Sequence, residues 1–583
     1  MSLPTVDLVI IVFYVLAVIV VGLLVRKAAS RGIDSYFLGE HQTSWWVLAA
    51  SGSSSYFDIT GTMWIVSLFM LYGVKGMWEQ WIWGFTYAAF FMTFMGKWIR
   101  RSNVVTGAEW MRTRFGAGPA SEWARASYAL LAVVTLVAFI AYSSVGIGKF
   151  GMAFLPGWSQ NQCALVIVGA VAVYATFGGF VSVVLIDLVH TVVLSAGVIA
   201  LSIFAFVTAS GTPAVQSFAQ GEMGSFAPPW RMSVPGYEMF GLLLMLWVLK
   251  GVIQELGGPP QMFDFQRFLA ARNSRDACKV GALWGVIHTL RWPFVAAIVV
   301  LALAAGLGSG YGEDPEAVLP IVLRESVPDG FRGLVLAALL AAFMSSLDAM
   351  VNAGASYMVR DFYQRYLRAK AGPRELVYAG YVASALLVAV GVAVIVVFQA
   401  TTIARMFQWI MLALGGGVMV PCVLRWYWWR FNGWGFTAGI LTGIAAALVK
   451  AVAFPDAAQW AYFLTMAGLD LVACVAVTLL TQPTERGALK RFYTSVQPGG
   501  WWGPVARDAA ADDAAFRREP FARDLANTLI AIPWIMGLYL VPIFLMFRRW
   551  PAMWGWLALA AVLSVVLYFT WYKHLPAPEA ETL

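Results

Sequence analysis

Five ionisable residues lie inside strongly apolar segments of the sequence. They are Asp58, Asp187, Lys250, Arg291 and Asp348. A charge inside a membrane-spanning segment is costly unless it is paired or faces water. Each of these residues is therefore either half of a structural ion pair or part of a functional site.

Hydroxyl groups surround one of these acids. Ser345, Ser346 and Asp348 offer three oxygens within one helical turn. Ala342 precedes Ser345 by three residues, so its carbonyl can share a helix face with the Ser345 hydroxyl. Na⁺, like other hard cations, takes oxygen ligands from carboxylates, hydroxyls and carbonyls. This spacing indicates a sodium site.

The composition excludes most classes of protein. The chain has 583 residues, of which 60% are hydrophobic and only 12% are charged, whereas about a quarter of the residues of a soluble protein are charged. A soluble fold cannot bury that much apolar surface. The apolar runs are long and continuous, and do not alternate as the strands of a membrane barrel do. The sequence therefore predicts an all-α integral membrane protein that lies in the lipid bilayer.

Two further classes of function are disfavoured. The net charge of +8 does not indicate a nucleic-acid partner, because Lys and Arg cluster in short segments between apolar runs, where they encode topology. An enzyme would need a nucleophile–base pair or a metal cluster. The four His residues show no ligand spacing, and the four Cys residues lie far apart with no CxxC pair. We therefore expect no enzymatic activity.

Fifteen segments have the length and apolarity of a spanning helix, which needs about 20 apolar residues. They begin near residues 5, 44, 78, 122, 160, 181, 237, 279, 332, 375, 403, 434, 458, 525 and 552. Basic residues follow the first, third, seventh and ninth segments, so the positive-inside rule places the N-terminus outside. Arg548 and Arg549 are the exception, because this count puts them outside. The connector 481–524 is polar and could hold an amphipathic helix.

The apolar pattern breaks inside two of these segments. The first break is the serine-rich stretch Ser51–Gly61, and the second is Gly257-Gly-Pro-Pro260, five helices later. Interrupted helices at matching positions of two five-helix halves indicate an inverted-repeat transporter with its binding site near the membrane midplane. The alternative is that small residues there only allow close helix packing, or that the second stretch simply ends a helix.

Four segments together resemble the sodium–solute symporter family, which includes bacterial sodium-coupled sugar, proline and sialate transporters. They cover roughly residues 5–480 in the family's order and spacing. The segments are Tyr36-Phe-Leu-Gly-Glu40 with Ser44-Trp-Trp46 and the serine-rich break, Phe177-Gly-Gly-Phe180 leading to Asp187, Gln266–Arg275, and Ala341–Asp348 continuing to Val359-Arg-Asp-Phe-Tyr363.

The resemblance implies a LeuT-type fold, in which two inverted five-helix repeats form the transport core. One extra helix would precede the core and about four would follow it, for 13–15 spans in all. Residues 1–43 would form the extra N-terminal helix and a cytoplasmic loop. Residues 44–430 would form the core, with repeats at about 44–208 and 237–426. Residues 431–583 would hold the extra helices, with a cytoplasmic loop at 481–524.

The resemblance also implies the ligands of a sodium ion. The main-chain oxygens of Ser54, Phe57 and Ala342 and the hydroxyls of Ser345 and Ser346 would bind Na⁺. Asp187 would be a nearby supporting anion. In some members a second sodium uses that acid and hydroxyls one turn past the serine pair, where this chain has Asp348 and Ala349. Asp348 could therefore support a second cation or carry a proton.

The residues of this chain match the family's sugar-binding site less well than its sodium site. Lys250 falls near a polar Asn of the sugar-transporting members, Gly61 replaces a sugar-contacting Gln, and Asp58 replaces a small residue. We expect the solute to lie between the first break and the helices near 79, 250, 291 and 408. Its candidate contacts are Asp58, Glu79, Gln80, Lys250, Gln254 and Gln408, with Trp64, Trp78 and Trp81 able to stack on a ring or a cation.

The working hypothesis is sodium-coupled uptake of a small polar organic solute, with a sugar-like solute favoured, across a bacterial inner (plasma) membrane. One alternative is a sodium symporter of an organic acid or amino-acid-like solute that uses Lys250. A second is proton coupling through Asp187 and Asp348. A third is a transporter-like sensor, with a partner at 481–524. The sequence sets neither the solute nor the oligomeric state.

Overall fold

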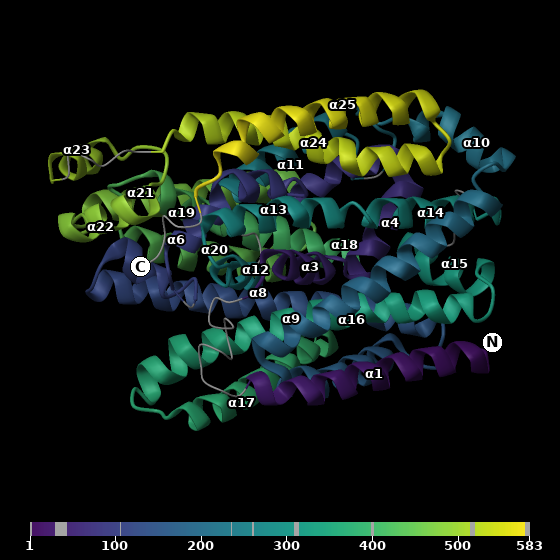
Figure 1. Cartoon of the computed structure of the whole chain (residues 1–583), viewed down its shortest axis with the longest axis horizontal. Helices are drawn as coiled ribbons and strands as arrows, with labels where there is room; N and C mark the ends of the chain where they lie inside the picture. The colour runs from purple at the N-terminus through teal and green to yellow at the C-terminus, as the bar shows by residue number, and fades with distance from the viewer. Residues whose placement is uncertain are drawn as a thin grey trace.

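The computed structural model describes residues 3–29, 43–104, 106–234, 236–258, 262–307, 314–397, 402–512 and 519–577. Within these ranges the chain is helical, and β pairing is limited to one isolated bridge between Trp428 and Trp501. Eleven helices are long and apolar enough to cross a membrane, and two shorter apolar helices cover Thr5–Val18 and Gln160–Ala172. Most of the long helices run along one axis of the molecule (Figure 1). This confirms the prediction of an all-α membrane protein.

The first expected repeat begins with a broken helix. α3 (Trp45–Tyr56) ends and α4 (Ile59–Tyr72) begins on either side of Phe57 and Asp58. The break therefore lies inside the serine-rich stretch where the sequence predicted it. The repeat continues with η2 (Gly73–Trp83), α5 (Tyr87–Phe90), η3 (Phe91–Met95), α6 (Gly96–Arg101), α7 (Trp110–Phe115), α8 (Pro119–Met152) and α9 (Gln160–Thr208).

The second expected repeat also begins with a broken helix. α11 (Phe240–Leu256) ends before Gly257, and α12 (Met262–Leu269) follows the break. Pro259 and Pro260 of the predicted break lie outside the described residues. The repeat continues with α13 (Ser274–His288), α14 (Arg291–Ala304), α15 (Val318–Ser326), α16 (Phe331–Ser356), η6 (Tyr357–Leu367), α17 (Pro373–Val397), α18 (Ile403–Gln408), η7 (Trp409–Leu414) and α19 (Gly415–Tyr427).

The 49-residue α9 holds two apolar arms, Gln160–Ala172 and Val184–Thr208. A straight helix of that length would extend about 73 Å, yet residues of both arms lie near one short stretch of α16. Val171 lines the same apolar cavity as Leu336, and a Cβ added to Gly197 would lie 2.5 Å from the Cβ of Ala338. The two arms coincide with the separate spans that the sequence predicted to begin near residues 160 and 181.

The remaining helices pack around the two repeats. α1 (Thr5–Ala29) lies along one edge of the bundle, and α24 and α25 lie along the opposite edge (Figure 1). The connector 481–524 holds two short helices, α22 and α23, at the end of the bundle opposite the N-terminus. The helices after the core are α20 (Gly433–Ala453), α21 (Gln459–Leu480), α22 (Arg486–Val496), α23 (Gly503–Asp512), α24 (Phe521–Met546) and α25 (Trp550–Thr570).

Glu519 ties the connector to the core. Its carboxylate accepts a hydrogen bond from the Lys97 ammonium at 2.6 Å and another from the Arg101 guanidinium. Burial alone would raise the pKa of Glu519, but these two cations outweigh it and hold the pKa at about 2. The connector is therefore anchored through an ionised carboxylate at any physiological pH.

Arg548 and Arg549 lie at the end of the bundle that holds the N-terminus, as the span count required. The Arg548 guanidinium donates to the Ser210 hydroxyl at 2.8 Å, and Arg549 donates to the Gly224 carbonyl. Both also lie over aromatic rings, Phe206 and Phe544. These contacts give each arginine a hydrogen-bond acceptor and an aromatic ring. Among the described residues, neither arginine forms an ion pair with an acidic side chain.

Cysteine labelling tests the orientation of the bundle. In a background without Cys163, Cys278, Cys422 and Cys474, Glu325→Cys should react with a membrane-impermeant maleimide in intact cells. Arg507→Cys should react only after lysis, because the more basic end of the bundle stays inside. The reverse pattern would show that the N-terminus is cytoplasmic.

Candidate cation and solute sites

The carboxylate of Asp187, on α9, is the centre of a buried polar cluster. Asp187 is 0% exposed. Its Oδ2 accepts a hydrogen bond from the Ser51 hydroxyl at 2.5 Å, and its Oδ1 accepts one from the Ser345 hydroxyl at 2.5 Å. The Arg267 guanidinium lies 3.4 Å from Oδ2. Helices α3, α9, α12 and α16 therefore meet at one carboxylate.

The serines of α3 and α16 bring further oxygens to this cluster. The Ser345 hydroxyl lies 2.9 Å from the Ser54 hydroxyl. The Ser346 hydroxyl donates to the Ser55 carbonyl at 2.6 Å and to the Ala342 carbonyl at 3.0 Å. Hydroxyl and carbonyl oxygens from two helices thus converge beside a carboxylate, which is the donor chemistry that a hard cation requires.

The structure brings most of the residues expected to bind sodium together. Ser54, Ala342, Ser345 and Ser346 all lie in the cluster around Asp187. Phe57 lies at the end of α3, where its N–H donates to the Ser54 carbonyl at 3.1 Å. The broken end of α3 therefore faces the serine pair of α16.

Three residues of the cluster were missing from the set expected from the sequence. Ser51 and Ser55 lie in the serine-rich stretch, and their i, i+4 spacing puts them on one face of α3. That spacing could have identified them. Arg267 was interpreted only as a topological charge after a span, but it is 2% exposed and its guanidinium donates to the Ser55 hydroxyl at 2.6 Å. No local signal distinguishes it from the exposed arginines nearby.

Asp348 lies on the same helix as the serine pair and is almost fully buried. The ring of Tyr14 lies 6.3 Å from the ring of His190, whose Nδ1 lies 3.7 Å from Oδ1 of Asp187. Tyr14 and His190 thus bring α1 to the polar region around Asp187.

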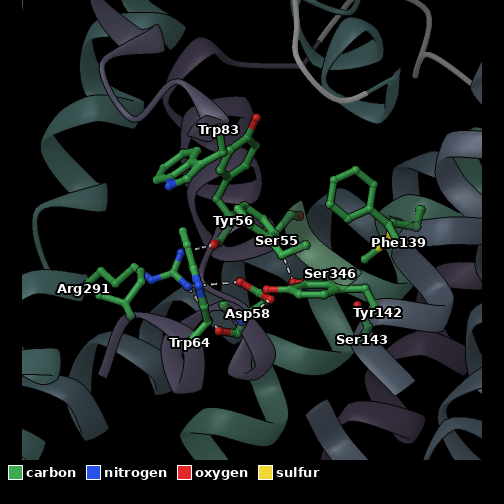
Figure 2. Close-up of a pocket in the computed structure, with 14 residues that line it drawn as sticks. Ser55, Tyr56, Asp58, Trp64, Trp83, Phe139, Tyr142, Ser143, Arg291 and Ser346 are labelled. Carbon is green, nitrogen blue, oxygen red and sulfur yellow. Dashed lines mark hydrogen bonds and ion pairs between the residues drawn. The ribbon is translucent and has the colours of Figure 1, made fainter. Parts of the chain in front are cut away.

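The second polar centre is the ion pair between Asp58 and Arg291 at the first helix break. Asp58 caps the N-terminus of α4, because its Oδ2 accepts a hydrogen bond from the Gly61 N–H at 2.7 Å. Its Oδ1 lies 3.1 Å from the Arg291 guanidinium, which also donates to the Tyr56 carbonyl at 2.8 Å. Figure 2 shows these groups facing one another across the break. The pair satisfies backbone groups on both sides of the break.

A small cavity of about 40 Å³ lies against this ion pair. Aromatic rings form its walls, and the rings of Trp64 and Phe407 lie 4.4 Å apart. Ser55 and Ser346 of the cation cluster also line it, and Figure 2 shows the hydrogen bond between them. The cavity has room for only a few water molecules, so a larger solute requires the walls to move apart. The aromatic residues that line it are Tyr56, Trp64, Trp83, Phe139, Tyr142 and Phe407.

The six residues expected to contact the solute do not all line one cavity. Asp58 lines the cavity. Gln408 donates to Glu79 at 3.4 Å in a cluster that also holds Tyr237. Lys250 donates to Gln254 and to the Ile82 carbonyl, and Gln80 accepts a hydrogen bond from Trp83 at 2.8 Å. In this structure only Asp58 of the six is a wall of the cavity, whereas Arg291 and Trp64 also line it.

Comparison with known proteins places these sites in a family. Residues 36–443 match the sodium:solute symporter family. The chain belongs to this family. This membership identifies a membrane transporter rather than an enzyme.

Curated relatives of this symporter transport different solutes. It is 27% identical to a sodium/mannose cotransporter of Bos taurus, over 77% of this chain and 79% of the relative. It is 23% identical to sodium/glucose cotransporter 4 of Mus musculus, over 88% of this chain and 79% of that relative. It is 24% identical to an osmoregulated proline transporter of Bacillus subtilis, over 62% of this chain and 72% of that relative.

A solved structure of similar fold is that of a Na⁺-coupled sialic acid symporter in a substrate-bound, outward-open state. It aligns with a TM-score of 0.65 at 16% identity, and the alignment covers 83% of this chain and 99% of that structure. The fold of this symporter is therefore the LeuT-type fold that the sequence resemblance implied.

The ion pair at the break should make Gly61 intolerant of a side chain. A Cβ at Gly61 would lie 2.5 Å from Oδ1 of Asp58 and 2.7 Å from the Arg291 guanidinium. We expect Gly61→Ala to destabilise the protein by about 1–3 kcal/mol, which is typical of overpacking. Thermal unfolding in detergent measures this loss.

Gly555→Ala is the matched control, because nothing lies within 4 Å of a Cβ there. This control should unfold at or slightly above the wild-type temperature, because alanine favours the helix. Equal melting temperatures for Gly61→Ala and the wild type would show that the ion pair at the break is not tightly packed.

Proposed function

We propose that this symporter uses the inward sodium gradient to take up a small polar organic solute, with a sugar-like solute favoured. The observation that carries the proposal is the contact between the two sites. Ser55 and Ser346 belong to the oxygen cluster around Asp187 and also line the cavity of Asp58 and Arg291. A cation and a solute in these sites would share the same two residues.

In this proposal Na⁺ is held by the main-chain oxygens of Ser54, Phe57 and Ala342 and by the hydroxyls of Ser345 and Ser346. Asp187 balances the charge of the ion. It also orients the Ser345 hydroxyl, which donates a hydrogen bond to Oδ1 of Asp187 at 2.5 Å. The ion would tie the broken end of α3 to α16. A cation bound more tightly in one access state favours that state, so sodium release would loosen the contact between these helices.

The solute is proposed to occupy an enlarged form of the cavity at the break. Asp58 offers carboxylate oxygens that accept from hydroxyl groups, and Arg291 offers N–H groups that donate to them. Aromatic walls such as Trp64 and Trp83 can pack on the apolar face of a sugar ring. An acidic solute would use Arg291 in this cavity, because Lys250 does not line it.

Coupling makes the transport concentrative. A membrane potential of 100 mV supplies about 2.3 kcal/mol for each inward charge, which alone supports a solute gradient of roughly 50-fold. Because coupling between binding sites is reciprocal, sodium raises solute affinity and solute raises sodium affinity by the same factor. We place the protein in the bacterial plasma membrane, with its N-terminus outside.

Electrical recording from reconstituted protein on a solid-supported membrane tests the coupling ion. A screen of sugars, polyols, amino acids and organic acids should reveal a solute-evoked current that disappears when choline replaces Na⁺ at fixed pH. A current that persists in choline and grows with acidity would replace sodium coupling by proton coupling through Asp187 and Asp348.

Removing one sodium ligand should weaken sodium activation. We expect Ser345→Ala to raise the Na⁺ concentration for half-maximal current about 10-fold, because it removes a hydroxyl from the site and leaves Asp187 with one donor fewer. Ser127→Ala is the control, since this buried serine only bonds the Ala124 carbonyl of its own helix. An unchanged sodium dependence of Ser345→Ala would place the ion elsewhere.

Changing the cavity should affect the solute more than the ion. We expect Asp58→Asn to raise the solute KM at least 10-fold at saturating Na⁺, because the amide has lost one acceptor and the charge that balances Arg291. Recordings over a range of solute concentrations measure this. A solute KM equal to that of the wild type would move the solute to the Glu79 cluster.

A further inference from the structure

A long apolar groove lies on the outside of the bundle, between α8, η6 and α17. It has a volume of about 590 Å³. Its walls are almost wholly aliphatic or aromatic, with Leu130 on α8, Met358 and Phe362 on η6, and Val382 and Leu386 on α17. The groove is separate from the cavity of Asp58 and Arg291.

The position of the groove fits the hydrocarbon of a lipid. Tyr378 and Val382 are each 68% exposed, and in a membrane such residues face the bilayer. The groove follows α17 from Glu375 to Leu386, a rise of about 17 Å. One leaflet of the hydrocarbon core is about 15 Å thick. A single acyl chain therefore matches the groove in length and in chemistry.

The end of the groove nearest the turn between η6 and α17 is basic. Arg365, Arg368, Lys370 and Arg374 are all exposed there. Arg365 pairs with Glu122 at 2.9 Å, and Arg368 pairs with Glu375 at 3.1 Å. Lys370 and Arg374 have no recorded ion-pair partner among the described residues. This mouth therefore carries positive charge that its own acids do not balance.

A second apolar groove has no such unbalanced charge on the lysine beside it. It has a volume of about 370 Å³ and lies between α1, α8, α9 and α16, with Leu8, Val166 and Met344 among its walls. The lysine on the adjoining end of α8, Lys149, is already paired with Asp314 at 2.8 Å and with Glu316 at 2.6 Å. Of these two grooves between described helices, the one beside α17 joins an apolar channel to unbalanced basic residues.

We propose that the groove between α8, η6 and α17 binds an anionic phospholipid. One acyl chain lies along α17, and the phosphate lies against the basic mouth formed by Arg368, Lys370 and Arg374. Clusters of basic residues next to membrane helices bind anionic headgroups in this way. The lipid would contact η6, which continues the helix that carries Ser345 and Ser346, so it would brace the cation-binding helix at its far end.

Lipid titration of the purified full-length protein tests this proposal. Native mass spectrometry should show one phosphatidylglycerol bound more tightly than phosphatidylcholine. The double variant Lys370→Gln/Arg374→Gln should weaken phosphatidylglycerol binding about 25-fold, since each basic residue near the surface contributes about fivefold. Arg491→Gln/Arg507→Gln removes two exposed basic residues of α22 and α23, outside the groove, and should leave this affinity unchanged.

A second pair of variants tests the acyl-chain part of the groove. Ala379→Trp fills the groove and should remove the tight phosphatidylglycerol while the basic mouth stays intact. Val390→Trp, on an exposed position of the same helix beyond the groove, should not. Equal affinity for the two lipids, or full binding by both Lys370→Gln/Arg374→Gln and Ala379→Trp, would overturn the proposal.

Discussion

A helix that stops halfway across a bilayer leaves carbonyl and N–H groups that no water can reach, and such groups are costly unless the protein itself supplies partners. The break between α3 and α4 meets this requirement with three side chains. Arg291 donates to the Tyr56 carbonyl, Asp58 accepts from the Gly61 N–H, and Ser346 donates to the Ser55 carbonyl. The groups that satisfy the break are the same groups that line the cavity and face the cation cluster.

The second break uses the same solution. The Gly257 carbonyl at the end of α11 accepts hydrogen bonds from the Arg425 guanidinium at 3.2 Å and from the Trp426 indole at 3.0 Å. Arg425 lies 5.0 Å from the centre of the Trp110 ring and 5.1 Å from that of Tyr128, so cation–π contacts help to offset its burial. A buried arginine from the second repeat thus satisfies the broken helix of each repeat, Arg291 at the first break and Arg425 at the second.

Asp187 connects the broken helices of the two repeats. Its two oxygens bond serines on α3 and α16, and Arg267 on α12 reaches the same carboxylate and the Ser55 hydroxyl. The broken helices of both repeats therefore meet at one buried charge. In the proposed function, a cation bound beside this charge would alter contacts that both repeats share, and this would couple ion binding to a change of access.

The sequence by itself predicted the membrane fold and both breaks, because apolar length and interruptions of an apolar run are local properties. That Asp187 lies near Ser345 was implied only by the resemblance to the family. The sequence did not determine the roles of Arg267 or Arg291, which depend on which helix each side chain faces. It also grouped Glu79, Lys250 and Asp58 in one solute site. Only the tertiary structure separated them, because helices that are close in a repeat can present their polar faces to different neighbours.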